Sequence, residues 1–180
     1  MRLFVGIALA NELTAELGRL CNRLRKPGDS LRWSAPEGWH ITLQFLGSAD
    51  EAQFESLKVR LTEVRSGPVP VRMGDLEVFD RAGAFVVEVA TSLELRELQQ
   101  RVVEATKKCG FVPEDRPYHP HITLARAKGD ARRQLRQLKA RIQSAPALPA
   151  FVAAEFLLYE SHLGLGGSKY VAQARFMLSR

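Results

Sequence analysis

The chain has 180 residues, of which 46% are hydrophobic and 26% are charged, and this composition excludes a disordered or fibrous protein. The length suits one domain with a substantial core and is too short for two independent domains, so we expect a single domain over residues 1–180. Lys and Arg outnumber Asp and Glu by 26 to 20, which favours an anionic partner such as RNA but indicates no particular chemistry.

The N-terminal segment is apolar but short. Arg2 precedes an apolar run of about ten residues, whereas a signal peptide needs roughly 15–30. No other apolar run approaches the roughly 20 residues that cross a bilayer. We therefore expect a cytoplasmic protein without a membrane partner. Cys21 and Cys109 lie in predicted helices without metal-ligand spacing, and we expect two buried thiols rather than a disulfide.

The first part of the chain predicts a strand, a helix, a second strand and a second helix. Residues 3–9 indicate a buried strand, and Asn11 is a suitable N-cap for a helix that ends at residues 26–29. The second strand lies within residues 33–46, and residues 48–51 form a capping box that opens the second helix. The residues expected on the buried faces are Leu13, Leu17, Leu20, Cys21 and Leu24 in the first helix, and Phe54, Leu57, Leu61 and Val64 in the second.

The middle of the chain predicts a strand pair and a third helix. Apolar alternation indicates strands over residues 69–79 and 84–90, joined by the turn 80–83. Residues 91–94 form another capping box, and Gly110 is the expected C-cap of the helix that follows. The residues expected on its buried face are Leu95, Leu98, Val102 and Cys109.

The last part of the chain repeats this order. It predicts a strand over residues 118–125, a helix over 131–143, a loop over 144–149, and strands over 151–161 and 170–178 across the turn 164–167. Leu135, Leu138 and Ile142 share one face of the helix. Because helix, strand, helix and strand pair occur twice, we expect an α+β fold of two pseudo-symmetric lobes, mainly of antiparallel sheet, with an active-site cleft between them.

The tetrapeptide His-Ile-Thr-Leu occurs at residues 40–43 and again at residues 121–124, 81 positions later. Side chains alternate along a strand, so each His and its Thr share one face while the Ile and Leu anchor the strand in the core. A lone histidine on such a strand is most often only hydrogen-bonded to its neighbours. A structural histidine has no reason to recur with its threonine, so the repeat indicates catalysis by His40 and His121.

Two histidines suit a reaction that removes one proton and delivers another at neutral pH, because the unperturbed pKa of imidazole lies near 6.5. Phosphodiester hydrolysis fits this requirement. A base takes a proton from the attacking water, an acid protonates the leaving oxygen, and flanking donors hold the equatorial oxygens. The hydroxyls of Thr42 and Thr123 are the expected donors.

Segments along nearly the whole chain resemble one family. They are residues 2–7, 39–47 around the first motif, 116–126 around the second, and 158–161 with 167–170 in the last strand pair. These segments resemble the two-histidine (2H) phosphoesterases, and within them the bacterial and archaeal RNA 2′,3′-cyclic phosphodiesterases once described as 2′-5′ RNA ligases. Tyr118 stands where phenylalanine is common in the family.

The resemblance implies hydrolysis of a terminal 2′,3′-cyclic phosphate of RNA to a 2′-phosphate. It implies no metal and no other cofactor, with His40 as proton donor, His121 as proton acceptor, and Thr42 and Thr123 as phosphate ligands. The expected partner is RNA with a 2′,3′-cyclic phosphate end, and we expect a monomer.

Three further residues near the motifs are weaker candidates. Arg126 suits a phosphate oxygen, but strict alternation places it on the face opposite His121 unless the strand bends, and an inter-strand ion pair is the alternative. We include Arg126 among the substrate-binding residues. His119 shares the face of His121, yet we expect it to support that residue or face solvent rather than act as a third catalyst. His162 is expected at the surface.

Basic and aromatic residues elsewhere offer two broader possibilities. The fourth predicted helix carries Arg132, Arg133, Arg136, Lys139 and Arg141, which either guide RNA or form a solvated face. A terminal base can stack on aromatic rings, and we expect one or two of five candidates to line the site while the others are core. The five are Trp33, Trp39, Phe45, Tyr159 and Tyr170.

Two other function classes stay open at this point. A non-catalytic RNA-binding module would use the motif strands only to shape a basic groove. A metal site would combine His40, His119 and His121, although no carboxylate or cysteine stands at ligand spacing. Within the enzyme class, hydrolysis and the reverse 2′-5′ ligation use the same acid and base, so the sequence does not separate them.

Overall fold

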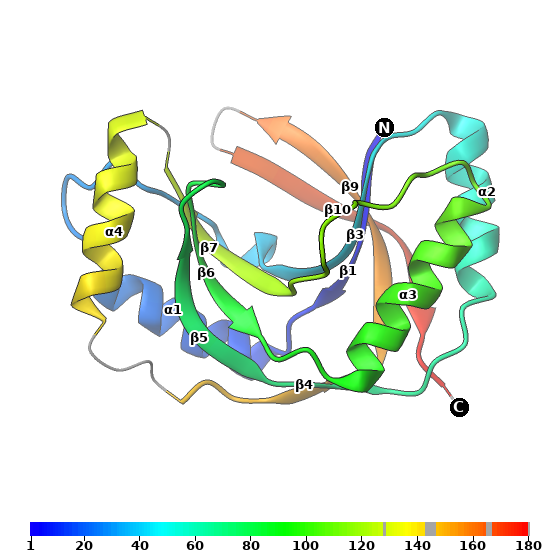
Figure 1. Cartoon of the computed structure of the whole chain (residues 1–180), viewed down its shortest axis with the longest axis horizontal. Helices are drawn as coiled ribbons and strands as arrows, with labels where there is room; N and C mark the ends of the chain where they lie inside the picture. Colours follow the sequence, from blue (N-terminus) through cyan, green and yellow to red (C-terminus); the bar gives the residue numbers. More distant parts are fainter. Residues whose placement is uncertain (128, 143–146, 165–166, 180) are drawn as a thin grey trace.

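Two four-stranded antiparallel sheets form the centre of the protein (Figure 1). The computed structural model describes residues 1–127, 129–142, 147–164 and 167–179. The first sheet has the order β10 (Gly167–Met177), β9 (Glu155–Gly164), β1 (Arg2–Ala8) and β3 (His40–Ser48). The second has the order β2 (Arg32–Trp33), β7 (His121–Arg126), β6 (Ala84–Val89) and β5 (Met73–Phe79). A short ladder joins β4 (Val69–Val71) to β8 (Phe151–Ala153).

Four α-helices flank the sheets in pairs. The helices are α1 (Asn11–Leu24), α2 (Glu51–Thr62), α3 (Leu93–Lys107) and α4 (Arg132–Arg141), with short 3₁₀ turns at Pro36–Gly38 and Gly129–Ala131. Figure 1 shows α2 and α3 beside the first sheet and α1 and α4 beside the second. Contacts of α3 with β3 and of α4 with β5 agree with this view. None of the described helices is long and apolar enough to span a membrane.

The chain consists of two matched halves. Corresponding elements of the halves begin 81 or 82 residues apart, as the paired starting residues show: Arg2 and Ala84, Asn11 and Leu93, His40 and His121, Glu51 and Arg132, Val69 and Phe151, Met73 and Glu155. The strands β9, β1 and β3 of the first sheet therefore match β5, β6 and β7 of the second. This arrangement confirms the prediction of an α+β fold with two pseudo-symmetric antiparallel lobes.

The halves are interlocked rather than side by side. β9 comes from the second half of the chain but lies in the first sheet, where it pairs with β1. Helix α3 follows β6 of the second sheet and packs against β3 of the first. Neither sheet is therefore completed by one half of the chain alone.

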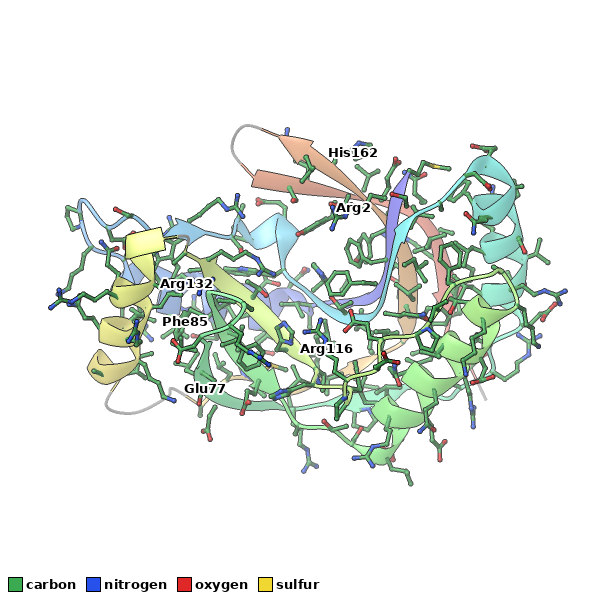
Figure 2. The ribbon with its side chains drawn as sticks, turned by 45° about the horizontal axis from the view of Figure 1, so that its top comes forward. Arg2, Glu77, Phe85, Arg116, Arg132 and His162 are labelled. Atoms are coloured by element: carbon green, nitrogen blue, oxygen red, sulfur yellow. The ribbon has the colours of Figure 1, made fainter. Side chains whose placement is uncertain are left out.

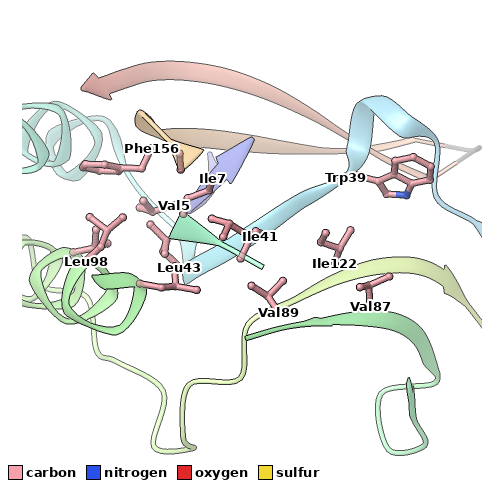
Figure 3. Close-up of a cluster of buried hydrophobic side chains, with 14 of the residues drawn as sticks. Val5, Ile7, Trp39, Ile41, Leu43, Val87, Val89, Leu98, Ile122 and Phe156 are labelled. Atoms are coloured by element: carbon pink, nitrogen blue, oxygen red, sulfur yellow. The ribbon is translucent and has the colours of Figure 1, made fainter. Parts of the chain in front are cut away.

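The motif strands are held in place by the core. Ile41, Leu43, Ile122 and Leu124 are all at most 2% exposed, which confirms the predicted alternation. They belong to one contiguous cluster that extends from Phe156 and Leu98 near the first sheet to Val87 near the second (Figure 3). Because the apolar residues occupy the core side of each strand, the histidines and threonines are presented on the opposite side.

The predicted helix starts are displaced by one or two residues. Ser48 pairs with Arg2 at the end of β3, so the capping box uses Asp50, whose carboxylate accepts from the Gln53 N–H at 2.8 Å. Ser92 rather than Thr91 caps α3 and accepts from the Leu95 N–H at 3.1 Å. Ala10 is the N-cap of α1, and Asn11 is already helical without a capping hydrogen bond.

Several predicted strands and helix ends are shorter than expected. The strands over 69–79 and 151–161 are each broken after three residues, because β4 and β8 pair with each other instead of with a sheet. Pro36 begins a 3₁₀ turn that separates β2 from β3 within the predicted strand region 33–46. β7 begins after Pro120 rather than at residue 118, because proline has no N–H to donate to a strand ladder. Helix α4 ends at Arg141, and residue 143 lies outside the described residues.

The two cysteines are free thiols, as expected. Cys21 is buried in α1, and burial raises the pKa of its thiol to about 11. Cys109 lies beyond the end of α3 and is only half-buried, which corrects its predicted place inside that helix. The helix ends at Lys107, so Gly110, at a φ of 85°, lies in the turn that follows rather than at the C-cap, which is Lys108.

Candidate active site

His40 and His121 lie on neighbouring strands from different lobes, because β3 and β7 contact each other where the two sheets meet. His40 pairs across the ladder with Ala8, and His121 pairs with Glu88. Both histidines and both motif threonines are half-buried. We call the side of the two sheets that carries His40, Thr42, His121 and Thr123 the histidine face.

Gly6 allows the strands to pack closely next to His40. A Cβ atom added at Gly6 would lie 2.9 Å from the carbonyl oxygen of Ile41 and 3.6 Å from the His40 ring. The first distance is shorter than real Cβ contacts allow, and the obstructing atom belongs to the backbone. A side chain at this position would therefore displace the strand that carries His40.

Each histidine is held by the same local hydrogen bond. The Nδ1 atom of His40 lies 2.8 Å from the carbonyl oxygen of Gly38, and Nδ1 of His121 lies 2.9 Å from the carbonyl oxygen of His119. A carbonyl oxygen only accepts, so in both rings Nδ1 carries a hydrogen and donates it. Nε2 is then the atom that accepts a proton in the neutral ring and donates one in the charged ring.

Aromatic rings surround His40. Its ring centroid lies 4.6 Å from that of Phe4 and 4.9 Å from that of Tyr170, with Tyr159 at 6.1 Å. The pKa of His40 is lowered to about 4. Burial is the largest cause, the hydrogen bond to the Gly38 carbonyl opposes it, and the charges of His121 and Arg126 add to the lowering. His40 is therefore neutral over most of the pH range in the absence of an anion.

Charged and polar groups surround His121. Burial is the largest cause that lowers the pKa of His121. The hydrogen bond to the His119 carbonyl opposes this shift, and the positive charges of His119, Arg126 and Arg116 lower the pKa further. Arg116 lies in the segment that leads into β7 (Figure 2). Phe79 packs edge-on against the His121 ring at 5.0 Å.

The other residue predicted near His121 is His119. Its side chain is paired with Glu88 at 2.8 Å, and its backbone carbonyl accepts from His121. This position agrees with the expectation that His119 supports His121. Among the described residues, no three His, Cys, Asp or Glu side chains lie close enough together to hold a metal ion.

Arg126 lies on the histidine face, contrary to strict alternation. In the β6–β7 ladder, Val86 pairs with Thr123 and Phe85 pairs with Ala125, so Leu124 is an extra residue in a β-bulge. Leu124 and Ala125 are both buried, and Arg126 is exposed. The bulge thus reverses the alternation and places Arg126 on the side of His121 and Thr123.

A matching bulge in β3 places Phe45 on the histidine face. Val5 pairs with Gln44 and Gly6 pairs with Thr42, so Leu43 is the extra residue. Gln44 turns into the core and its amide oxygen accepts from Thr106 at 2.7 Å. Phe45 is 50% exposed and occupies in the first lobe the place that Arg126 occupies in the second.

The five predicted aromatic residues divide into two groups. Phe45, Tyr159 and Tyr170 all lie within 6.1 Å of the Phe4 ring, centroid to centroid, and Phe4 in turn contacts His40. Trp39 is buried in the core (Figure 3), and Trp33 packs edge-on against the buried Phe85. Three of the five therefore lie near a histidine, one more than the largest number expected.

Other predicted residues lie away from the histidines. His162 is exposed and pairs with Glu160, as expected for a surface residue. On α4, Arg136 lies 3.9 Å from Asp80, Lys139 pairs with Glu77, and Arg132 and Arg133 are exposed. The side chain of Arg141 lies outside the described part of the structure. Two surface hollows, one between α2 and α3 and one between β5 and α4, lie away from the histidines.

Sequence reasoning missed Phe4, Phe79 and the role of the Tyr118 hydroxyl. Phe4 and Phe79 lie on strands next to or near a motif strand, and only the sheet order brings them to the histidines. Tyr118 is half-buried and its hydroxyl donates to the backbone carbonyl of Thr42 at 3.1 Å. The signal available in the sequence was the tyrosine at a position where the resembling family commonly has phenylalanine.

Comparison with known proteins agrees with this architecture. RNA 2′,3′-cyclic phosphodiesterase of Bacillus subtilis is 41% identical over 100 residues, which are 53% of this chain and 55% of that protein. The enzyme of the same name from Aeropyrum pernix is 31% identical over 121 residues, or 65% and 69% of the two chains. That from Methanocaldococcus jannaschii is 28% identical over 175 residues, or 94% and 96%.

Solved structures share the fold. Escherichia coli LigT complexed with 3′-AMP has a TM-score of 0.81 at 23% identity, over 99% of this chain and 98% of that one. TT0787 of Thermus thermophilus has a TM-score of 0.75 at 23% identity, with the same coverage. The family model of the 2′-5′ RNA ligase superfamily matches residues 7–164. This range contains both histidine motifs and nearly all of the duplicated architecture, and the chain therefore belongs to the 2′-5′ RNA ligase superfamily.

Proposed function

We propose that the protein hydrolyses the 2′,3′-cyclic phosphate at the end of an RNA to a 2′-phosphate, with His40 and His121 as the acid–base pair. One observation carries the proposal. The two histidines lie on contacting strands, and each has Nδ1 bound to the carbonyl two residues earlier, so that each Nε2 is left for proton transfer. The names of the relatives, RNA 2′,3′-cyclic phosphodiesterase, support the same substrate.

The reaction needs one proton removed and one delivered. One imidazole accepts a proton from water as the water oxygen bonds to phosphorus. The bond between phosphorus and the 3′ oxygen breaks, and the other imidazole, initially protonated, gives its proton to that oxygen. The Thr42 and Thr123 hydroxyls donate to the non-bridging oxygens, and Arg126 supplies positive charge. The phosphate remains on the 2′ oxygen.

We assign His40 as the acid and His121 as the base, following the family resemblance. The surroundings of His40 impose a condition on this assignment. Its pKa is lowered to about 4 without substrate, so the ring must gain its proton when the anionic phosphate binds, since a nearby negative charge raises the pKa of histidine. A reversed assignment would place the proton on the less buried His121, and a substrate with a sulfur leaving group separates the two assignments.

The same groups support a second reaction. If a 5′-hydroxyl replaces water as the nucleophile, the acid and base roles are unchanged and the product is a 2′-5′ linkage. We propose hydrolysis as the main reaction, because water at high concentration competes with any second RNA end. We also propose that residues 1–180 act as one bilobal domain, because both lobes contribute to the histidine face. Following the family resemblance, we propose that this domain needs no metal ion, and we expect it to act as a monomer.

The decisive experiment incubates the purified protein with an RNA that ends in a 2′,3′-cyclic phosphate, in excess chelator. Phosphorus NMR of the product is expected to show a 2′-phosphate monoester. A 3′-phosphate product, no reaction, or a reaction that requires an added divalent ion would each contradict part of the proposal. A simple RNA-binding module is distinguished by His40→Gln, which is expected to retain RNA binding and lose turnover.

A further inference from the structure

Arg32 and Arg126 form an unusual pair on the second sheet. They are direct partners across the β2–β7 ladder, and directly opposite side chains lie on the same face of a sheet. Like charges at such positions repel and destabilise the ladder. Both residues are exposed, and neither has a carboxylate within ion-pair distance among the residues that the structure describes.

The side of the sheet that this pair occupies is the histidine face. The bulge at Leu124 aligns Arg126 with Thr123 and His121. Trp33, the neighbour of Arg32, points to the other side, because its ring packs against the buried Phe85. Alternation therefore places Arg32 on the same side as Arg126.

The two arginines lie on neighbouring strands. Arg126 is on β7, the strand that carries His121, and Arg32 is on the edge strand β2, roughly 4.8 Å away across the sheet. One guanidinium beside the histidines is sufficient for a single cyclic phosphodiester, which carries one negative charge. The second guanidinium, beside it, has no carboxylate within ion-pair distance in the described part of the chain and suits a second anion.

We infer that Arg32, next to Arg126, binds a second phosphate of the substrate, the one attached to the 5′ oxygen of the terminal nucleoside. The inference rests on the proposed function, since it takes the cyclic phosphate to lie at the histidines. A cyclic phosphate occupies the 2′ and 3′ oxygens, so the 5′ oxygen is the remaining attachment point on that nucleoside. The site therefore selects RNA ends and 5′-phosphorylated nucleotides over a bare nucleoside 2′,3′-cyclic phosphate.

The test compares four substrates with the wild-type protein and Arg32→Gln. They are a nucleoside 2′,3′-cyclic phosphate, the same compound with a 5′-monophosphate, a dinucleotide ending in a cyclic phosphate, and that dinucleotide with an uncharged methylphosphonate linkage. Arg32→Gln is expected to raise KM about tenfold for the two substrates with a charged 5′ phosphate, with kcat within about twofold. For the bare nucleoside and the methylphosphonate, KM is expected to stay unchanged.

The two charged substrates identify the source of the phosphate. An effect on both shows that the site accepts any phosphate on the 5′ oxygen, and an effect on the dinucleotide alone shows that it requires the diester of an RNA chain. Arg133→Gln is the matched control, because it removes one exposed arginine from α4, and it is expected to change none of the four KM values. Arg32→Lys is expected to recover part of the loss, since it restores charge without the planar fork.

The inference is overturned if Arg32→Gln changes all four KM values equally or changes none of them. Failure of the proposed function looks different, because the wild-type protein would then open none of the four compounds. In that case, binding of a dinucleotide 3′-phosphate and of its methylphosphonate analogue is measured by calorimetry. Equal affinity of the wild-type protein for the two compounds would then overturn the inference independently of catalysis.

Discussion

His40 and His121 share one hydrogen-bond arrangement and differ in everything around it. Each donates from Nδ1 to the carbonyl two residues earlier, yet His40 is enclosed by aromatic rings and His121 by charged groups. Replacing either with alanine is expected to lower the rate of cyclic phosphate opening by about two to four orders of magnitude, the usual range for acid–base groups. Rates are compared after circular dichroism has shown that the variants fold, and an unimpaired variant would contradict the acid–base roles.

The roles of the two histidines are separated by the leaving group. When sulfur replaces the bridging 3′ oxygen of the substrate, the leaving group departs as a stable thiolate. Protonation by the acid is then nearly unnecessary. His40→Ala is expected to recover most of its rate on this substrate, and His121→Ala, which lacks the base, is not. Recovery by His121→Ala alone would indicate that His121 is the acid and His40 the base. Recovery by neither variant would indicate that the histidines bind phosphate without moving protons.

The lowered pKa of His40 predicts a loss of stability in acid. The folded state holds this ring neutral down to about pH 4, whereas the unfolded chain protonates it near pH 6.5, so the unfolded state binds more protons between these values. Stability is therefore full above pH 6.5 and falls as the pH is lowered through this window. Between about pH 7 and pH 4.5 the wild-type protein is expected to lose on the order of 2 kcal/mol more than His40→Gln.

Urea denaturation at the two pH values measures this difference. The variant retains His121 and the carboxylates of the protein, so their contributions largely cancel in the comparison. Equal losses in both proteins would show that His40 is protonated as easily in the folded state as in the unfolded chain.

At the scale of the element, the two β-bulges determine which side chains join the motif residues on the histidine face. Without them, Phe45 and Arg126 would point into the core, and with them each stands beyond a His-x-Thr pair. The lobes are therefore alike in backbone and different in chemistry, with an aromatic ring in the first and a guanidinium in the second. This difference makes the otherwise symmetric site directional, so we expect the proposed RNA substrate to bind in one orientation.

Phe45 is expected to stack on a base of the substrate. It is 50% exposed, so its replacement by alanine is expected to cost little stability. The lost stacking is expected to raise KM roughly five- to a hundredfold, in keeping with the contribution of one base–aromatic contact. Phe45→Tyr retains a ring and is expected to behave like the wild-type protein, whereas Phe45→Leu is not. If Phe45→Leu and Phe45→Tyr had the same KM, the ring would have no stacking role.

At the scale of the whole molecule, Tyr118 links the two motifs directly. It precedes the strand of His121, and its hydroxyl donates to the backbone carbonyl of Thr42 on the strand of His40. Burial raises the pKa of this hydroxyl, so it stays protonated and remains a donor. The bond crosses from one lobe to the other, and we expect it to help set the separation of the histidines.

Tyr118→Phe removes only this hydroxyl. We expect the free energy of unfolding to fall by about 1 kcal/mol and kcat to fall a few-fold, with little change in KM. Thr106→Val is the control, because it removes a buried hydrogen bond to Gln44 in the first lobe, away from the second motif. It is expected to lower stability without lowering kcat. Equal kcat values for Tyr118→Phe and Thr106→Val would show that the inter-lobe bond does not position the histidines.

The sequence by itself determined the duplicated α+β plan and the residues of the two motifs. The identical tetrapeptides stand 81 positions apart in the sequence. The alternation of a strand assigns their Ile and Leu to the core and their His and Thr to the other side. The helices were predictable from their apolar faces, but their starts were displaced by a residue or two. At α2 the reason is that the predicted cap, Ser48, is paired with Arg2 in the sheet, so Asp50 caps the helix instead.

Only the tertiary structure decided what surrounds each histidine. Arg126 and Phe45 reach the histidine face through bulges, and a bulge depends on how a strand is paired with its neighbour, which the sequence of one strand does not record. Phe4, Phe79 and Tyr118 are distant in sequence from the groups that they contact, so sheet order and the packing of the lobes bring them there. The pairing of Arg32 with Arg126 is also decided by sheet order, because the sequence of a two-residue strand does not indicate which strand it pairs with.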